Sequence, residues 1–110
     1  MAYDENLAEK LNRLIKRRKG FARKKMFGGV GFLLNGHMCF GVYEDCLILR
    51  LGEESAQKAL TGQHTRAFDI TGHAMKGWVM VEAAGTRNSA AVKEWIDGAI
   101  GFVKTLPPKD

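Results

Sequence analysis

One stretch of the sequence, from Lys24 to Gly52, constrains the fold most, because strand patterning and turn residues agree along its whole length. An apolar run from Val30 to Leu34 ends at Asn35-Gly36, the dipeptide that most readily takes the positive φ angles of a two-residue hairpin turn. A second polar break, at Glu44-Asp45, precedes another run rich in β-forming residues. The stretch therefore predicts three consecutive antiparallel strands, over residues 30–34, 37–43 and 46–51.

A two-residue loop at Glu44-Asp45 sets the pairing of the second and third strands. Tyr43 then pairs with Cys46, and Val42 pairs with Leu47. The expected core face carries Met38, Phe40, Val42, Leu47, Leu49 and Leu51, and the opposite face carries Cys39, Gly41, Tyr43, Cys46, Ile48 and Arg50. On this register the two cysteines share a face but lie roughly 13 Å apart at ~3.3 Å per residue. We therefore expect them to stay reduced and unbonded to each other.

The composition is typical of an ordinary globular domain. Hydrophobic residues make up 45% of the 110 residues, a length that can bury a core without disulfides or metals. No apolar run approaches the roughly 18 residues that a membrane span requires, and the acidic, polar start differs from a signal peptide. These features predict a single cytoplasmic domain over residues 1–110.

The positive charge of the chain is concentrated in one segment. The net charge is +5, but residues 10–25 contain nine basic residues and no acidic one, which leaves a formal charge of −4 for the rest. A block of this kind is a solvated outer face, a nucleic-acid-binding surface or a surface for an acidic protein partner. The basic block consists of Lys10, Arg13, Lys16, Arg17, Arg18, Lys19, Arg23, Lys24 and Lys25.

The flanking segments predict helices and two further strands from their spacing and capping residues. The expected order α-β-β-β-α-β-β-α, connected mainly by hairpins, indicates an α+β two-layer domain. Its mainly antiparallel sheet has about five strands, with helices packed against it. The flanking elements are a helix from Asp4 to Gly20, a short helix from Gly52 to about Leu60, strands over residues 68–70 and 78–82, and a helix that begins at Asn88 or Ser89 and ends before Pro107.

Few residues could carry chemistry. The glycine-rich segment from Phe27 to Gly31 lacks the Gly-Lys-Ser/Thr of a Walker loop and precedes a strand, so a bulge or close backbone approach is favoured over a phosphate site. Cys39 lies two residues from His37 on the same strand, the only arrangement that suggests a nucleophile and a base. The histidines and cysteines have no metal-ligand spacing. We therefore expect no enzymatic activity, no metal and no cofactor.

Two short motifs connect the chain to a known family. Met26-Phe27-Gly28-Gly29-Val30-Gly31-Phe32, with the Asn-Gly hairpin after it, and Met75-Lys76-Gly77-Trp78-Val79 together resemble the N-terminal domain of the TfoX/Sxy competence regulators. The resemblance continues to Leu106-Pro107-Pro108. It implies a two-layer fold like that of type III secretion chaperones. It also implies a bacterial cytoplasmic protein of competence transcription control, acting alongside the cyclic-AMP receptor protein in the best-known members.

The resemblance covers the N-terminal domain of those regulators and not their second, helical domain, and it supplies no catalytic residues. We therefore expect a non-enzymatic regulatory or adaptor domain that binds a protein of the transcription apparatus. The alternative is direct, non-sequence-specific nucleic-acid binding through the basic block. A homodimer is also expected, because sheet edges must be covered or paired and secretion chaperones commonly dimerise.

Overall fold

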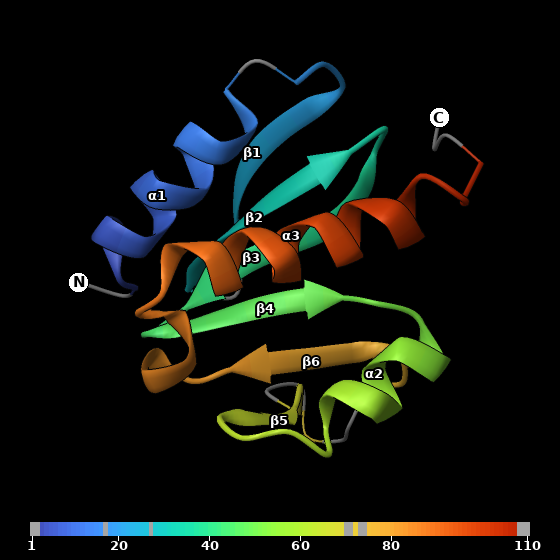
Figure 1. Cartoon of the computed structure of the whole chain (residues 1–110). Helices are drawn as coiled ribbons and strands as arrows, with labels where there is room; N and C mark the ends of the chain where they lie inside the picture. Colours follow the sequence, from blue (N-terminus) through green and yellow to red (C-terminus); the bar gives the residue numbers. More distant parts are fainter. Residues whose placement is uncertain (1–2, 17, 27, 70–71, 73–74, 108–110) are drawn as a thin grey trace.

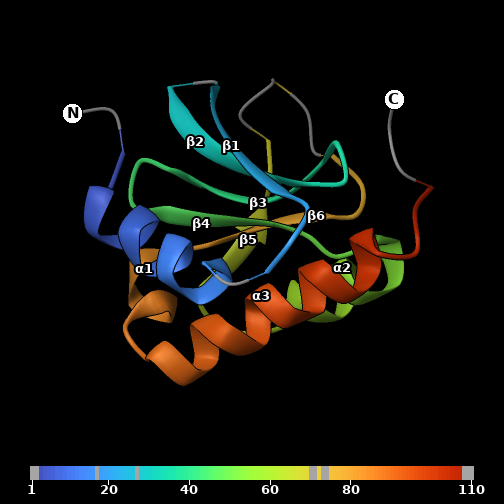
Figure 2. The same cartoon turned by 90° about the horizontal axis from the view of Figure 1, so that it is seen from above.

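The computed structural model describes residues 3–16, 18–26, 28–69, 72 and 75–107, with the backbone alone for Met26. They form one antiparallel sheet of six strands in the order β1-β2-β3-β4-β6-β5 (Figure 1). Figure 2 shows all three helices on one side of this sheet. The expected α+β two-layer fold is therefore confirmed. In chain order the elements are α1 (Glu5–Ile15), β1 (Phe21–Met26), β2 (Gly29–Leu34), β3 (His37–Tyr43), β4 (Cys46–Arg50), α2 (Glu53–Ala59), β5 (Thr65–Ala67), β6 (Trp78–Val81), a 3₁₀ turn (Ala83–Thr86) and α3 (Ser89–Val103).

The middle of the sheet is the predicted three-stranded meander. Asn35 and Gly36 have φ angles of 54° and 88°, as the two-residue turn between β2 and β3 requires. Glu44, in the next turn, also has a positive φ of 53°. Tyr43 lies opposite Cys46 in the predicted register of β3 and β4.

A bulge in β3 overturns part of the predicted face assignment. Phe32 pairs with Phe40, but the next residue, Leu33, pairs with Met38, so Cys39 is the extra residue. One extra residue inverts the alternation of side chains. Cys39 therefore packs into the core under the helices, and Met38 packs on the opposite face with Cys46. The cysteines are free, as predicted, but they lie on opposite faces of the sheet and not on one.

The main core lies between the sheet and the helices. It buries the inward apolar residues of α1 and α3, such as Leu11 and Ile96, against Phe32, Phe40 and Leu49 of the sheet. The open face carries a smaller cluster of four buried residues, with Trp78 and Tyr43 packed at its border. That cluster consists of Cys46, Ile48, Phe68 and Met80. None of the described helices is long and apolar enough to cross a membrane.

Helix ends agree with the capping residues that the sequence offers. The Asp4 side chain accepts a hydrogen bond from the Leu7 amide at 3.1 Å, and the Asn88 side chain accepts one from Ala90 at 2.8 Å. The first helix nevertheless ends at Ile15, several residues before Gly20. The reason is tertiary, because the Gly20 carbonyl accepts a hydrogen bond from Asn35 and already belongs to the sheet.

Two strands differ from their predicted places. Residues 21–26, for which the sequence predicted no helix or strand, form β1 and pair with β2 along their whole length. The strand expected at residues 68–70 lies at Thr65–Ala67, where it pairs with β6. Phe68 instead turns into the open-face cluster, and Ile70 lies outside the described residues. In both cases the position of the partner strand decides which residues pair.

Candidate protein-interaction site

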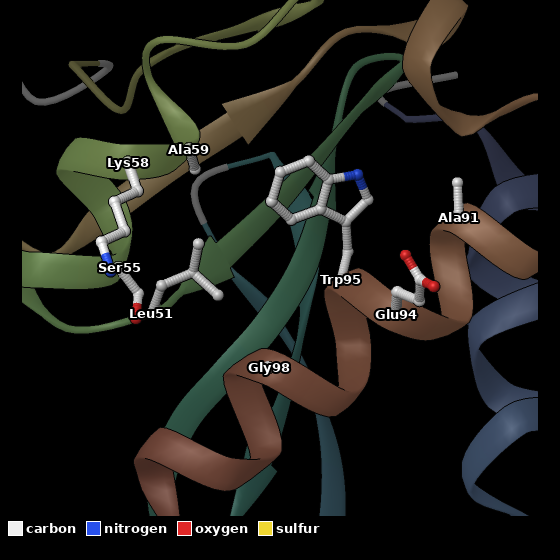
Figure 3. Close-up of a pocket in the computed structure, with 8 residues that line it drawn as sticks. All are labelled: Leu51, Ser55, Lys58, Ala59, Ala91, Glu94, Trp95 and Gly98. Atoms are coloured by element: carbon white, nitrogen blue, oxygen red, sulfur yellow. The ribbon is translucent and has the colours of Figure 1, made fainter.

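A groove of about 570 Å³ lies between α2 and α3 (Figure 3). Its lining is mainly apolar, and the Trp95 ring projects from α3 toward Ala59 of α2, while Leu51 directly follows β4. Lys58 stands on the α2 side and Glu94 on the α3 side. The lining residues are Leu51, Ser55, Lys58, Ala59, Ala91, Glu94, Trp95 and Gly98.

Small side chains on both helices leave this groove open. The α2 residues that line it are Ser55, Lys58 and Ala59, of which only the largely exposed Lys58 is large. Gly98 of α3 is exposed, and a Cβ built there would meet only Leu51 Cδ2, at an ordinary contact distance of 3.6 Å. Packing therefore does not require glycine at this position. Glycine stands there even though, inside a helix, it lowers the stability of the fold by about 1 kcal/mol relative to alanine.

The two walls of the groove carry opposite charges. Lys58 lies 3.9 Å from Glu54 on its own helix, and both side chains are largely exposed, so this ion pair contributes little. Glu94 has no ion pair within the part of the chain that the structure describes. Both charges are therefore available to a molecule that enters the groove.

The structure distributes the basic block over three elements. Lys10 and Arg13 lie on α1; Lys16, Arg18 and Lys19 lie in the following turn; Arg23, Lys24 and Lys25 lie on β1; and Arg17 lies outside the described residues. Lys10 lines a small hollow of about 250 Å³ that also contains Arg87, a basic residue that the charge count along the sequence did not connect to the block. The block is contiguous in sequence but divided among three structural elements.

Two arginines of the block are already paired with carboxylates. Arg13 lies 3.7 Å from Glu9, and Arg18 lies 3.3 Å from Asp97 of α3. Asp97 also accepts a hydrogen bond from Lys93, and Lys93 together with Arg18 holds the pKa of the Asp97 carboxyl below its usual value. Arg18 therefore ties the end of α1 to α3 and is less available to an external anion.

The glycine motif is a hairpin turn and not a phosphate loop. Gly28 has a φ of 77°, and Met26 pairs with Gly29 where β2 begins. A Cβ on Gly29 would overlap the carbonyl oxygen of Val42, and Gly31 lies directly opposite Gly41. The side chain of Met26 and the whole of Phe27 lie outside the described part. Gly29 and Gly41 therefore serve close approach between β2 and β3, and Gly28 supplies the left-handed conformation of the turn.

The second sequence motif is also structural. Gly77 has a φ of 85°, and its carbonyl accepts hydrogen bonds from the amides of Leu51 and Gly52 at 2.8 and 3.1 Å. Trp78 packs against Phe68 with 5.5 Å between ring centroids, and the Arg50 guanidinium lies 5.5 Å from the centre of the same indole. This motif joins the end of β4 to the start of β6.

His37 and Cys39 do not form a reactive pair. His37 Nε2 lies 2.6 Å from the carbonyl oxygen of Pro107, and Cys39 is fully buried on the helix-covered side. Burial raises the pKa of the Cys39 thiol to about 12, so it holds almost no thiolate near neutral pH. Burial also raises the pKa of Cys46. The described residues contain no group of three potential metal ligands.

Comparison with known protein families matches residues 13–103 to the TfoX N-terminal domain. No curated protein and no solved structure matches the chain. The matched segment contains all six strands, the glycine-rich turn before β2 and the Gly77-Trp78 motif. The chain therefore belongs to the TfoX N-terminal domain family.

Proposed function

We propose that this domain is a non-enzymatic regulatory adaptor that binds a protein of the transcription apparatus. Membership in the TfoX N-terminal domain family supports the regulatory role. The observation that carries the binding role is the groove between α2 and α3, which has a mainly apolar lining and oppositely charged walls. Its occupant is an amphipathic helix of the partner, in the helix-in-groove mode by which many regulatory domains bind.

The residues that line the groove favour a helix as its occupant. Ala59, Ala91 and Gly98 have little or no side chain, so the backbone of a bound helix could approach closely. Leu51 and Trp95 offer apolar contact, and tryptophan is among the residues that most often dominate binding energy. Lys58 and Glu94 would select a helix with an acidic residue on one flank and a basic residue on the other.

Nucleic acid is the alternative partner, through the basic block. Two observations rank this alternative second. The basic block is divided among α1, the following turn and β1, and two of its arginines, Arg13 and Arg18, are paired with carboxylates. The rest of the chain has a formal charge of −4 and would repel a long duplex. If about five phosphates were neutralised, the logarithm of duplex affinity would fall with the logarithm of salt at a slope of about −4 to −5.

Two glycines of α3 provide a matched test. Gly98→Leu fills the groove, whereas Gly101→Leu adds the same side chain at an exposed position where a Cβ meets nothing within 4 Å. Each variant would be titrated calorimetrically against the cyclic-AMP receptor protein and against RNA polymerase. We expect Gly98→Leu to weaken binding by about tenfold or more, because a blocked hot spot costs above ~1.4 kcal/mol, and Gly101→Leu to bind like the wild type.

Melting temperatures of both variants serve as the control for folding, since leucine favours helix over glycine. If the wild type, Gly98→Leu and Gly101→Leu bound a partner with equal affinity, the groove would not be the binding site. Sub-micromolar, steeply salt-dependent binding of duplex DNA, with neither transcription protein bound, would instead favour the nucleic-acid alternative. Light scattering of the wild type would test the expected homodimer separately.

A further inference from the structure

The outer edge of β1 is open to another strand. β1 is the first strand in the sheet order, and β2 is its one partner strand among the described residues (Figure 1). Residues 22–25 are exposed. An edge strand of six residues presents a row of backbone N–H and C=O groups that can pair with an added strand.

The hairpin register shows which backbone groups point outward. The Asn35 amide donates to the Gly20 carbonyl, so these two residues form a hydrogen-bonded pair at the start of β1. In an antiparallel ladder, such pairs alternate with pairs that have no mutual hydrogen bonds. The backbone of Ala22 and Lys24 therefore bonds to β2, and the amides and carbonyls of Phe21, Arg23 and Lys25 face away from the sheet.

Three consecutive cations flank these outward groups on both faces of the sheet. Arg23 pairs with Phe32 and Lys25 with Val30, both core residues, so these two side chains share the helix-covered face. Lys24 lies opposite Gly31, which has no side chain to cover it, on the open face. Arg23 stacks 5.7 Å from the centre of the Phe32 ring, whereas Lys24 and Lys25 form no ion pair in the described part of the chain.

The charges decide which strand could add to this edge. A second copy that paired its own β1 antiparallel would bring lysine and arginine side chains opposite one another, which is destabilising. An acidic strand would place opposite charges at the same positions, and such cross-strand pairs are favourable. The edge cations thus disfavour self-association while they favour one class of partner.

We infer that β1 binds an extended acidic segment of a partner protein by strand addition. The segment hydrogen-bonds to Phe21, Arg23 and Lys25, and consecutive acidic side chains meet Arg23, Lys24 and Lys25 on the two faces. This inference extends the proposed adaptor role to a second surface, at the sheet edge and not between the helices.

The probe for this edge is a labelled seven-residue peptide with three central glutamates flanked by valine and threonine. Its control has lysine in place of glutamate. Amide hydrogen exchange of the wild type should slow at Arg23 and Lys25 when the acidic peptide is added. It should stay unchanged at Lys24, whose amide already bonds to β2. The lysine peptide should not bind.

Two variants of Lys25 separate backbone pairing from charge attraction. Lys25→Ala and Lys25→Pro remove the same charge, but only proline removes the outward amide, at an edge position that tolerates it. We expect Lys25→Pro to bind the acidic peptide about fivefold more weakly than Lys25→Ala, the effect of one lost hydrogen bond. Melting curves check that both fold, and the exchange measurement needs neither variant.

A charge-matched pair completes the test. Lys24→Glu with Lys25→Glu should abolish peptide binding, whereas Lys16→Glu with Lys19→Glu, outside β1, should change it by less than about twofold, since long-range attraction is screened by salt.

Equal binding by Lys25→Pro and Lys25→Ala, or binding without slower exchange at Arg23 and Lys25, would overturn strand addition. Tight duplex DNA binding with no peptide binding would overturn it as well. Gly98→Leu should leave peptide binding unchanged. The proposal for the β1 edge and the proposal for the groove are therefore tested independently of each other.

Discussion

The two faces of β2 and β3 are built in different ways. Toward the helices, these strands present large side chains such as Phe32 and Phe40, which are fully buried. Toward the open face they present Gly31 directly opposite Gly41, and Met38 and Tyr43 lie on the same face at the border of the small cluster. A Cβ on Gly41 would lie 2.5 Å from the Val30 carbonyl oxygen. The helix-covered face is therefore held by buried apolar area, whereas the open face combines a small apolar cluster with close backbone approach at the glycines, so substitutions at these glycines should destabilise the fold for a different reason.

The largest effect is expected at Gly29. Gly29→Val would drive a branched side chain into the Val42 carbonyl, and the strands cannot separate without breaking the ladder. We expect a loss of about 5 kcal/mol in the free energy of unfolding, comparable to the whole stability of a small domain. Chemical denaturation followed by circular dichroism measures it.

Gly28 is the matched control for this prediction. A Cβ there has nothing within 4 Å, but the φ of 77° is left-handed. Gly28→Ala should therefore cost only about 1 to 2 kcal/mol, the strain of that conformation. A folded, stable Gly29→Val protein would show that close approach does not determine the structure of this face.

The next largest effect compares one aromatic residue from each face. Phe40 is fully buried and stacks on Phe32 with 5.0 Å between ring centroids, so Phe40→Ala should cost about 3 to 5 kcal/mol. Phe68 belongs to the small open-face cluster, where neighbours can close around a lost ring, and Phe68→Ala should cost about 2 kcal/mol. Thermal melting of the two variants shows which of them loses more stability. A larger loss for Phe68→Ala would mean that the open-face cluster, and not the helix-covered core, dominates stability.

The smallest effect is the loss of stability expected between pH 8 and pH 10. Burial raises the pKa of Cys39 to about 12 from the ordinary value of 9.0. The unfolded chain therefore releases this proton first as pH rises, and the stability contributed by Cys39 is complete below about pH 9 and is lost between pH 9 and 12. The loss is up to about 1.4 kcal/mol per pH unit in this window. Denaturation at pH 8 and pH 10 should show a steeper decline for the wild type than for Cys39→Ala, and parallel declines would contradict it.

Turn chemistry made the meander predictable, and the bulge limited that prediction. Asn35-Gly36 and Glu44-Asp45 determine their own backbone angles locally, so the register of β3 against β4 followed from the residues alone. The extra residue at Cys39 has no comparable local signal. It appears only in the pairing of β3 with β2, between Met38 and Phe40, and for that reason Met38 and Cys39 were assigned to the wrong faces.

The candidate groove could not be predicted from the sequence. Gly98 and Ala91 are ordinary small residues of a helix, and Lys58 and Glu94 are ordinary surface charges. They line one groove only because α2 and α3, about 40 residues apart in the chain, lie side by side on the same face of the sheet. The basic block shows the converse, since a charge run that is continuous in the sequence is divided among three elements.

The sequence by itself determined the fold class, the central meander, the helix cap at Asp4, the start of the last helix to within one residue and the family, because these depend on local turn and capping chemistry and on short motifs. Tertiary structure alone decided where α1 ends, that residues 21–26 form a strand, which face Cys39 occupies and that a groove lies between two helices. Each of these depends on a partner element far away in the chain. A strand or groove exists only when that partner is in place, and no local residue pattern records its position.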